Sequence, residues 1–205
     1  MAAMPNKGLS VVAHPAIFRS TRYLKIGANM HINLPALTRE GVNAAGMKLV
    51  ETQAPLALLD GDILFLGEIP HQTDFEKGFP IAFYRENGEE KWDPIEDDTS
   101  LVMNIKGKGL VILSGCAHSG IVNTVLYARE VTGVETVYAV MGGFHLTGPL
   151  FEAIIGRTTD ELKKLNPAHI IPTHCTGRKA SAYMEKEMGN QFILNMSGTK
   201  MTFAA

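Results

Sequence analysis

The pattern of apolar and polar positions divides the chain into two parts with different rhythms. Before residue 100 the apolar runs are short, at 9–14, 47–53 and 62–69, and glycine, proline or aspartate bounds each of them, which is typical of strands. The residues between the first two runs show no clean period and are predicted to form an irregular excursion. The polar, turn-rich residues 84–98 are predicted to form an exposed loop.

After residue 100 the pattern predicts a hairpin and then alternating helices and strands. Residues 101–113 resemble two strands joined by a tight Gly-Lys turn. The segments that follow are predicted as strands at 110–115, 134–142 and 168–174 and as helices at 120–133, 151–166 and 177–189. This succession implies right-handed crossovers and largely parallel pairing, so the expected fold class is α/β.

Each of the three later strands is expected to end in a loop that carries a histidine. The loops are "GCAHSG" with His118, "GGFHLTG" with His145 and "PTHCTG" with His174. Parallel strands place their carboxyl ends at one edge of the sheet, which is where open α/β sheets bind ligands. Neutral imidazole is the commonest zinc ligand in proteins, and an open-site ion yields a bound hydroxide that attacks a carbonyl or phosphoryl centre. The three loops therefore indicate a candidate hydrolytic metal site.

A pair of histidines binds a metal weakly, so a further ligand is expected. The carboxylates that could supply this ligand are Asp97 and Asp98, which precede the hairpin, and Glu68. For Asp97, the role of a solvated charge in a loop is an equal alternative. The remaining histidines do not follow a predicted strand in the same way. Structural roles are expected for His14 and His169, and the spacing suggests no partner for His31 or His71.

The two cysteines offer a different chemistry. Cys116 and Cys175 lie beside the loop histidines, and a cysteine that a histidine activates can act as a nucleophile. Neighbours in sequence rarely form such pairs, but Cys116 could meet His174 across the strand ends. Thiol catalysis is therefore one interpretation of these loops. It ranks below a metal-dependent hydrolase and below a protein that binds a ligand without catalysis. Two cysteines are too few for a disulfide-rich secreted scaffold.

Composition narrows the class of protein. A chain of 205 residues with 45% apolar and 20% charged residues is expected to form one domain, 1–205. The net charge of -2 argues against nucleic-acid or anionic-membrane partners, and no apolar run is long enough to span a bilayer. The first fifteen residues lack the apolar block of a signal peptide, so a cytoplasmic location is expected. The partner expected for a hydrolytic site is a small-molecule substrate.

Several motifs, taken in order, resemble the metallo-β-lactamase superfamily. They are "DDTSLVMNIKGKGLVILSGCAHSGIVNT", "MGGFHL" and "PTHCTG", and the upstream "AHPAIFRSTRY" and "GEIPHQTDFE" fit as well, so the similarity covers nearly the whole chain. Within the superfamily they are similar to the metal-dependent hydrolases known as dihydropterin-ribofuranosyl-aminobenzene-phosphate synthases. The resemblance implies an αββα sandwich.

The resemblance also implies roles for individual residues. His118 and His174 match metal ligands, and His145 matches a histidine of the pocket. The predicted catalytic residues are His145 and Asp98. The predicted metal is zinc, with iron, manganese or another divalent ion as alternatives. Cys116 then becomes a packing residue or a neighbour of the ligands.

One part of the family pattern is absent from this sequence. The signature His-x-His-x-Asp-His has no counterpart, because no two histidines here are separated by one residue. The fold is therefore expected to be truncated at its N-terminus, and the apolar surface that this uncovers is expected to be buried in a homo-oligomer. The predicted function is metal-dependent hydrolysis of an ester, lactone or phosphoester; the alternative is a non-catalytic, ligand-binding remnant of such an enzyme.

Overall fold

The computed structural model describes residues 8–27 and 30–204. Seven of the fifteen residues on which the expectation about a signal peptide rests, 1–7, therefore lie outside the described residues. The chain forms two compact units. Unit 1 comprises the residues up to Ala54 and residues 79–97, and unit 2 comprises residues 55–78 and those from Asp98 onward. The expectation of one domain over 1–205 stays a prediction.

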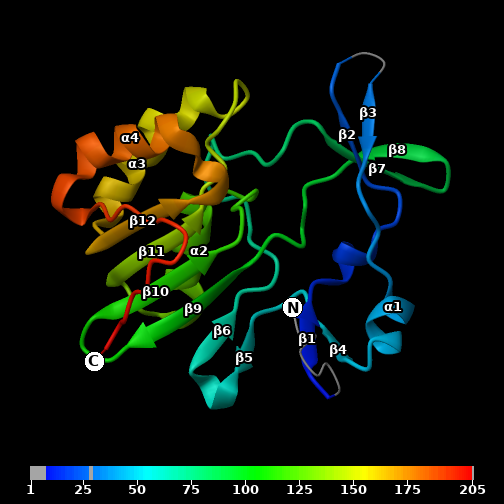
Figure 1. Cartoon of the computed structure of the whole chain (residues 1–205), viewed down its shortest axis with the longest axis horizontal. Coiled ribbons are helices and arrows are strands. Elements are labelled where there is room, and N and C mark those ends of the chain that lie inside the picture. The colour runs from blue at the N-terminus through cyan, green and yellow to red at the C-terminus, as the bar shows by residue number, and fades with distance from the viewer. Residues whose placement is uncertain (1–7, 28–29, 205) are drawn as a thin grey trace. The chain divides into compact units, whose positions relative to one another are not determined.

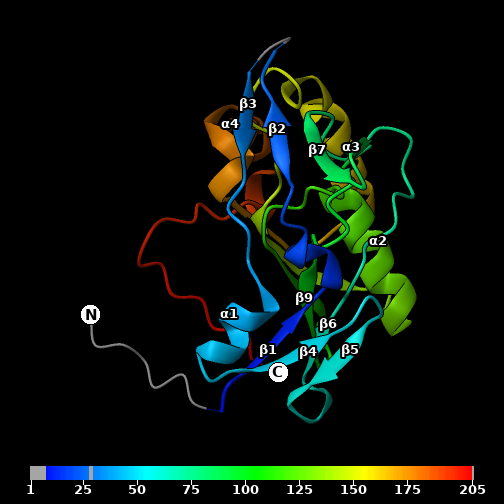
Figure 2. The ribbon, with the colours of Figure 1, turned by 90° about the vertical axis from the view of Figure 1, so that its right-hand side faces the viewer.

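Unit 1 contains two small sheets and a short helix. In one sheet β1 (Ser10–Ala13) pairs in parallel with β4 (Lys48–Glu51), and Figure 2 shows the two strands side by side. The second sheet has the order β3-β2-β7-β8, with bounds Tyr23–Lys25 for β2, His31–Asn33 for β3, Ala82–Glu86 for β7 and Glu89–Trp92 for β8. Helix α1 (Arg39–Ala44) begins after Thr38, whose Oγ1 accepts a hydrogen bond from the Gly41 N–H.

Two sequence expectations for unit 1 were wrong. The supposed excursion between the first two apolar runs contains β2, β3 and α1, and the supposed loop at 84–98 contains most of the β7–β8 hairpin. Asn87 and Gly88 have φ values of 53° and 85°, the positive pair that a two-residue hairpin turn requires. The charged side chains of β8, all exposed, concealed this Asn-Gly signal.

The β2–β3 region also bears on the expected oligomer. The side chains of Met30, Ile32 and Leu34 are exposed there, and β3 is an edge strand. Exposed apolar surface at a sheet edge favours pairing with another chain. The homo-oligomer itself stays a prediction.

Unit 2 is built on a six-stranded sheet with the order β12-β11-β10-β9-β6-β5 (Figure 1). The bounds are Leu56–Leu58 for β5, Ile63–Phe65 for β6, Ser100–Ile105 for β9, Gly109–Ser114 for β10, Val137–Gly143 for β11 and His169–Thr173 for β12. Strands β9 and β10 form the predicted hairpin, and β10, β11 and β12 are parallel, as predicted.

Two helices connect the three parallel strands, and a third follows β12. They are α2 (Ile121–Thr132), α3 (Ile155–Leu165) and α4 (Gly177–Met188), close to the predicted positions. The short 3-10 helices are Pro15–Phe18, Leu59–Gly61, Glu152–Ile154, His174–Thr176 and Gly189–Gln191. None of the helices in the described part of the chain is long and apolar enough to cross a membrane.

The helices cover one face of the sheet in unit 2. Alternate residues of β10 separate the faces: Leu110 and Ile112 belong to the core shared with α2, α3 and α4, whereas Val111 belongs to a smaller cluster on the other face. Apolar side chains from residues 193–203 cover that second cluster. Just before this segment, Phe192 forms an isolated parallel bridge with Ile170 of β12.

A buried glutamate that sequence reasoning missed holds the start of α2. Glu76 is 4% exposed, and its carboxylate oxygens accept the N–H groups of Val122 at 3.1 Å and Asn123 at 2.8 Å. Gly120 precedes the helix without a side-chain cap, and a Cβ there would overlap the Glu76 carboxylate. Glu76 therefore supplies the missing cap from a distant segment and fixes the helix that follows the His118 loop.

Glu76 gives the stability of the protein a pH dependence of known sign. Burial raises the pKa of Glu76 to about 7, although hydrogen bonds from Asn123 and Val122 oppose the shift. Between pH 4.5 and 7 Glu76 therefore keeps its proton in the folded state and releases it in the unfolded state. The contribution of Glu76 to the free energy of unfolding then falls as the pH rises through this range. Relative to Glu76→Gln, the wild type should lose on the order of 3 kcal/mol of unfolding free energy from pH 5 to pH 8.

Urea unfolding of both proteins at several pH values measures this difference. The exposed Glu68→Gln is the matched control and should run parallel to the wild type. A difference between wild type and Glu76→Gln that stays constant with pH would contradict the proposed linkage.

Candidate functional site

The loops after β10, β11 and β12 share an unusual backbone conformation. Ala117, His145 and His174 have φ values of 54°, 46° and 52°, in the left-handed region that non-glycine residues seldom adopt. Each such residue costs about 1–3 kcal/mol, and residues of this kind gather at ligand sites. All three predicted histidine loops therefore carry a strained residue at the carboxyl edge of one sheet.

Two of these loops bring sulfur and imidazole together. The Sγ of Cys116 lies 3.5 Å from Nδ1 of His174, so the meeting across the strand ends that the sequence suggested does occur. The Sγ of Cys175 lies 3.4 Å from the carbonyl oxygen of Cys116. Ligand atoms of Cys116, His174 and Cys175 all lie within 4.8 Å of one another. Among residues 8–27 and 30–204 this is the only such group of three that could hold a metal ion.

The middle strand makes room for this sulfur–imidazole cluster, which we define as Cys116, His174 and Cys175. Gly143 ends β11 between the other two loops, and its N–H donates to the carbonyl oxygen of Gly115 at 3.0 Å. A Cβ at Gly143 would lie 2.7 Å from Sγ of Cys175 and 2.6 Å from the oxygen of Gly115. Only glycine fits there without displacing the thiol.

The two thiols influence each other. A hydrogen bond between the side chains lowers the pKa of Cys175 to about 7, while burial opposes the shift. The same hydrogen bond, together with burial, raises the pKa of Cys116. Of the two sulfur atoms, Cys175 therefore carries a negative charge more readily.

The other two predicted histidines form a second group with Asp98. The rings of His118 and His145 meet edge to face with centroids 4.5 Å apart, and Nδ1 of His118 lies 4.0 Å from Oδ1 of Asp98. The N–H of Ser119 donates to the other oxygen of Asp98 at 2.9 Å. Asp98 reaches this edge because β9 is antiparallel to β10, which places the start of β9 beside the end of β10.

Burial changes the pKa of His145. It lowers the pKa of His145, although interactions with Cys116 and Asp98 raise it in part. The ring of Phe151 packs edge to face against this imidazole, with centroids 4.5 Å apart. The interaction with Cys116 also indicates that the two groups at this edge are neighbours.

Other sequence candidates lie elsewhere. Asp97 accepts a hydrogen bond from Arg22 at 2.8 Å within unit 1; burial raises its pKa, but this contact lowers it overall. Glu68 is exposed. His14, as expected, is structural, because its Nδ1 accepts the N–H of Ala16 at 3.1 Å in a buried turn. His169 packs edge to face against Tyr138 at the opposite end of β12 from His174.

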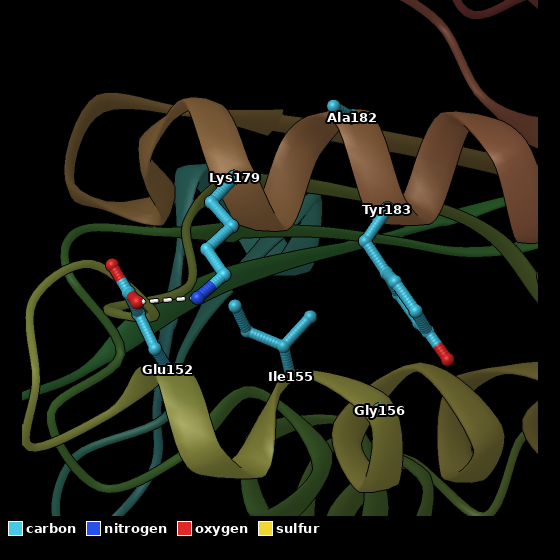
Figure 3. A pocket seen from close by; sticks show the side chains of 6 residues that line it. All are labelled: Glu152, Ile155, Gly156, Lys179, Ala182 and Tyr183. Carbon is cyan, nitrogen blue, oxygen red and sulfur yellow. Dashed lines mark hydrogen bonds and ion pairs between the residues drawn. The ribbon is translucent and has the colours of Figure 1, made fainter.

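A shallow hollow of about 420 Å³ also opens between α3 and α4 (Figure 3). An ion pair of 2.7 Å between Lys179 and Glu152 crosses one end, and Tyr183 lies toward the other. Ile155 and Gly156 form its floor, and its lining contains no cysteine, no histidine and no group of metal ligands.

Comparison with known proteins places this geometry in context. The solved structure of a metal-dependent hydrolase of the β-lactamase superfamily superposes with a TM-score of 0.79 at 23% identity, over 97% of this chain and 73% of that one. The chain has a metallo-β-lactamase-like fold. The predicted fold is therefore confirmed.

Two curated proteins are similar to this chain in sequence. The chain is 36% identical over 190 residues to 7,8-dihydropterin-6-methyl-4-(beta-D-ribofuranosyl)-aminobenzene-5'-phosphate synthase of Methanocaldococcus jannaschii, covering 91% of this chain and 64% of that protein. A second protein of that organism, whose name assigns no activity, is 30% identical over 83% of this chain and 59% of its own length. The chain thus spans about three fifths of these relatives, and the resemblance to this branch is confirmed. No protein-family model matches the chain.

Proposed function

We propose that this protein is a metal-dependent hydrolase whose active site lies at the carboxyl edge of β10, β11 and β12. The observation that carries the proposal is the gathering of metal-ligating side chains at this edge, in the fold of a metal-dependent hydrolase. The related synthase and the hydrolase bear different names, so we propose hydrolysis as the activity class and a small molecule with an ester, lactone or phosphoester bond as the substrate.

The donor set fits a divalent ion. Two sulfur atoms and one imidazole nitrogen lie within 4.8 Å of one another, and zinc, the ion we propose, takes such donors in tetrahedral sites. We propose His174 as a ligand, with His118 as the donor from the loop after β10. When bound, a divalent ion acidifies a water ligand and polarises a carbonyl or phosphoryl oxygen.

The remaining residues hold the site in shape. We propose that Asp98, fixed by the Ser119 N–H, orients the His118 ring, since its Oδ1 lies 4.0 Å from Nδ1 of His118. We propose His145 as the group that exchanges a hydrogen bond or proton with substrate, because its half-buried ring contacts that of His118. Phe151 limits the movement of the His145 ring.

Hydrolysis should depend on the metal. We expect turnover of at least one substrate in a panel of activated esters, lactones and phosphodiesters, and a loss of at least about 100-fold after dialysis against a chelator, since open-site metals supply the nucleophile. Zinc should restore the rate, whereas magnesium should not. Absence of chelator-sensitive turnover on the whole panel would favour a ligand-binding remnant over an enzyme.

A further inference from the structure

The distance between Cys116 and His174 matches that between two ligands of one ion. Zinc–sulfur bonds of about 2.3 Å and zinc–nitrogen bonds of about 2.0 Å at a tetrahedral angle place the two donors roughly 3.5 Å apart. The Sγ of Cys116 and Nδ1 of His174 are separated by 3.5 Å. These atoms need no rearrangement to share an ion.

Cys175 offers a third donor to the same ion. Its sulfur lies within 4.8 Å of both other donors, and two sulfur ligands of one tetrahedral zinc lie about 3.8 Å apart, so a small side-chain rotation suffices. The absent side chain of Gly143 leaves the space that this thiol needs. His174 is exposed and both cysteines are half-buried, so an ion can reach these three side chains from solvent.

We propose that Cys116 and Cys175 ligate, as thiolates, the same ion that His174 binds. The inference rests on the proposed function for the presence of a metal at this edge, and it adds two sulfur donors that the family resemblance does not supply. Binding releases the thiol protons to solvent, since thiolates are the ligating form. Soft sulfur donors select zinc over magnesium or manganese, which prefer oxygen.

Cobalt is a direct probe of sulfur ligation. The chain of 205 residues is stripped of metal under reducing conditions, loaded with Co²⁺ and examined in the near ultraviolet, where thiolate-to-cobalt charge transfer absorbs. The wild type should show this band, and Cys116→Ser and Cys175→Ser should each lose about half of it, because each removes one of two sulfur ligands. The double variant should lose the band entirely.

His169→Gln is the matched control, since it changes a histidine at the other end of β12, and it should keep the full band. Cobalt that is bound, by elemental analysis, without a charge-transfer band in the wild type would overturn sulfur ligation and leave the hydrolase proposal intact. A wild type that binds neither cobalt nor zinc would refute both. The wild-type spectrum decides even where a serine variant fails to fold.

Discussion

Replacing His118 and His174 together by alanine should remove the bound metal and the chelator-sensitive activity. Protein purified without added metal should carry close to one ion per chain, and the double variant should carry almost none. Loss of a residue that hydrogen-bonds to a metal ligand typically weakens metal binding by about 10–100-fold. Loss of two proposed ligands should weaken it further. Elemental analysis of the purified proteins measures the effect, and chelator-treated wild type gives the zero point.

The matched control replaces two histidines outside the strand-end loops. His31→Ala with His71→Ala removes the same number of imidazoles from exposed positions and should leave the ion in place. Retention of the metal in the His118/His174 double variant, with its fold intact by circular dichroism, would disprove both assignments.

Gly142→Ala should strongly destabilise the protein. Gly142 has φ of 122° inside β11, and a Cβ there would overlap the carbonyl oxygen and the hydroxyl of Ser114 on the neighbouring strand. Backbone strain and this overlap together should lower the unfolding free energy by about 3 kcal/mol or more. Urea unfolding measures the change.

Gly148→Ala separates the two causes. Gly148 also has a positive φ, of 87°, but nothing lies within 4 Å of where its Cβ would be. This variant should therefore lose only about 1 kcal/mol, from strain alone. Equal losses at the two positions would mean that the close approach of β10 and β11 at Gly142 is not a constraint.

The second half of the fold could be predicted because its periodicities are local. The 101–113 hairpin and the strand-helix alternation after it can be read from neighbouring residues, and parallel pairing then brings His118, His145 and His174 to one edge. The position of Asp98 follows from the same hairpin. The first half contains short strands, and the charged β8 disguised a hairpin whose signal was only two residues long.

The arrangement within the site could not be predicted, because it depends on contacts between distant segments. Glu76 caps α2 from a separate loop, and the sequence offers no signal for that pairing beyond an uncapped Gly120. The sequence suggested Cys116 with His174, but Cys175 joins them only because Gly143 leaves space between the loops. The family resemblance directed attention to histidines and away from sulfur.

The strained loops have a consequence for ligand affinity. Ala117, His145 and His174 hold their left-handed backbone in the folded chain itself. The packing of the sheet and helices that carry these loops offsets the backbone strain when the chain folds. An incoming ion or substrate therefore meets a preorganised site and spends little of its binding free energy on ordering the backbone.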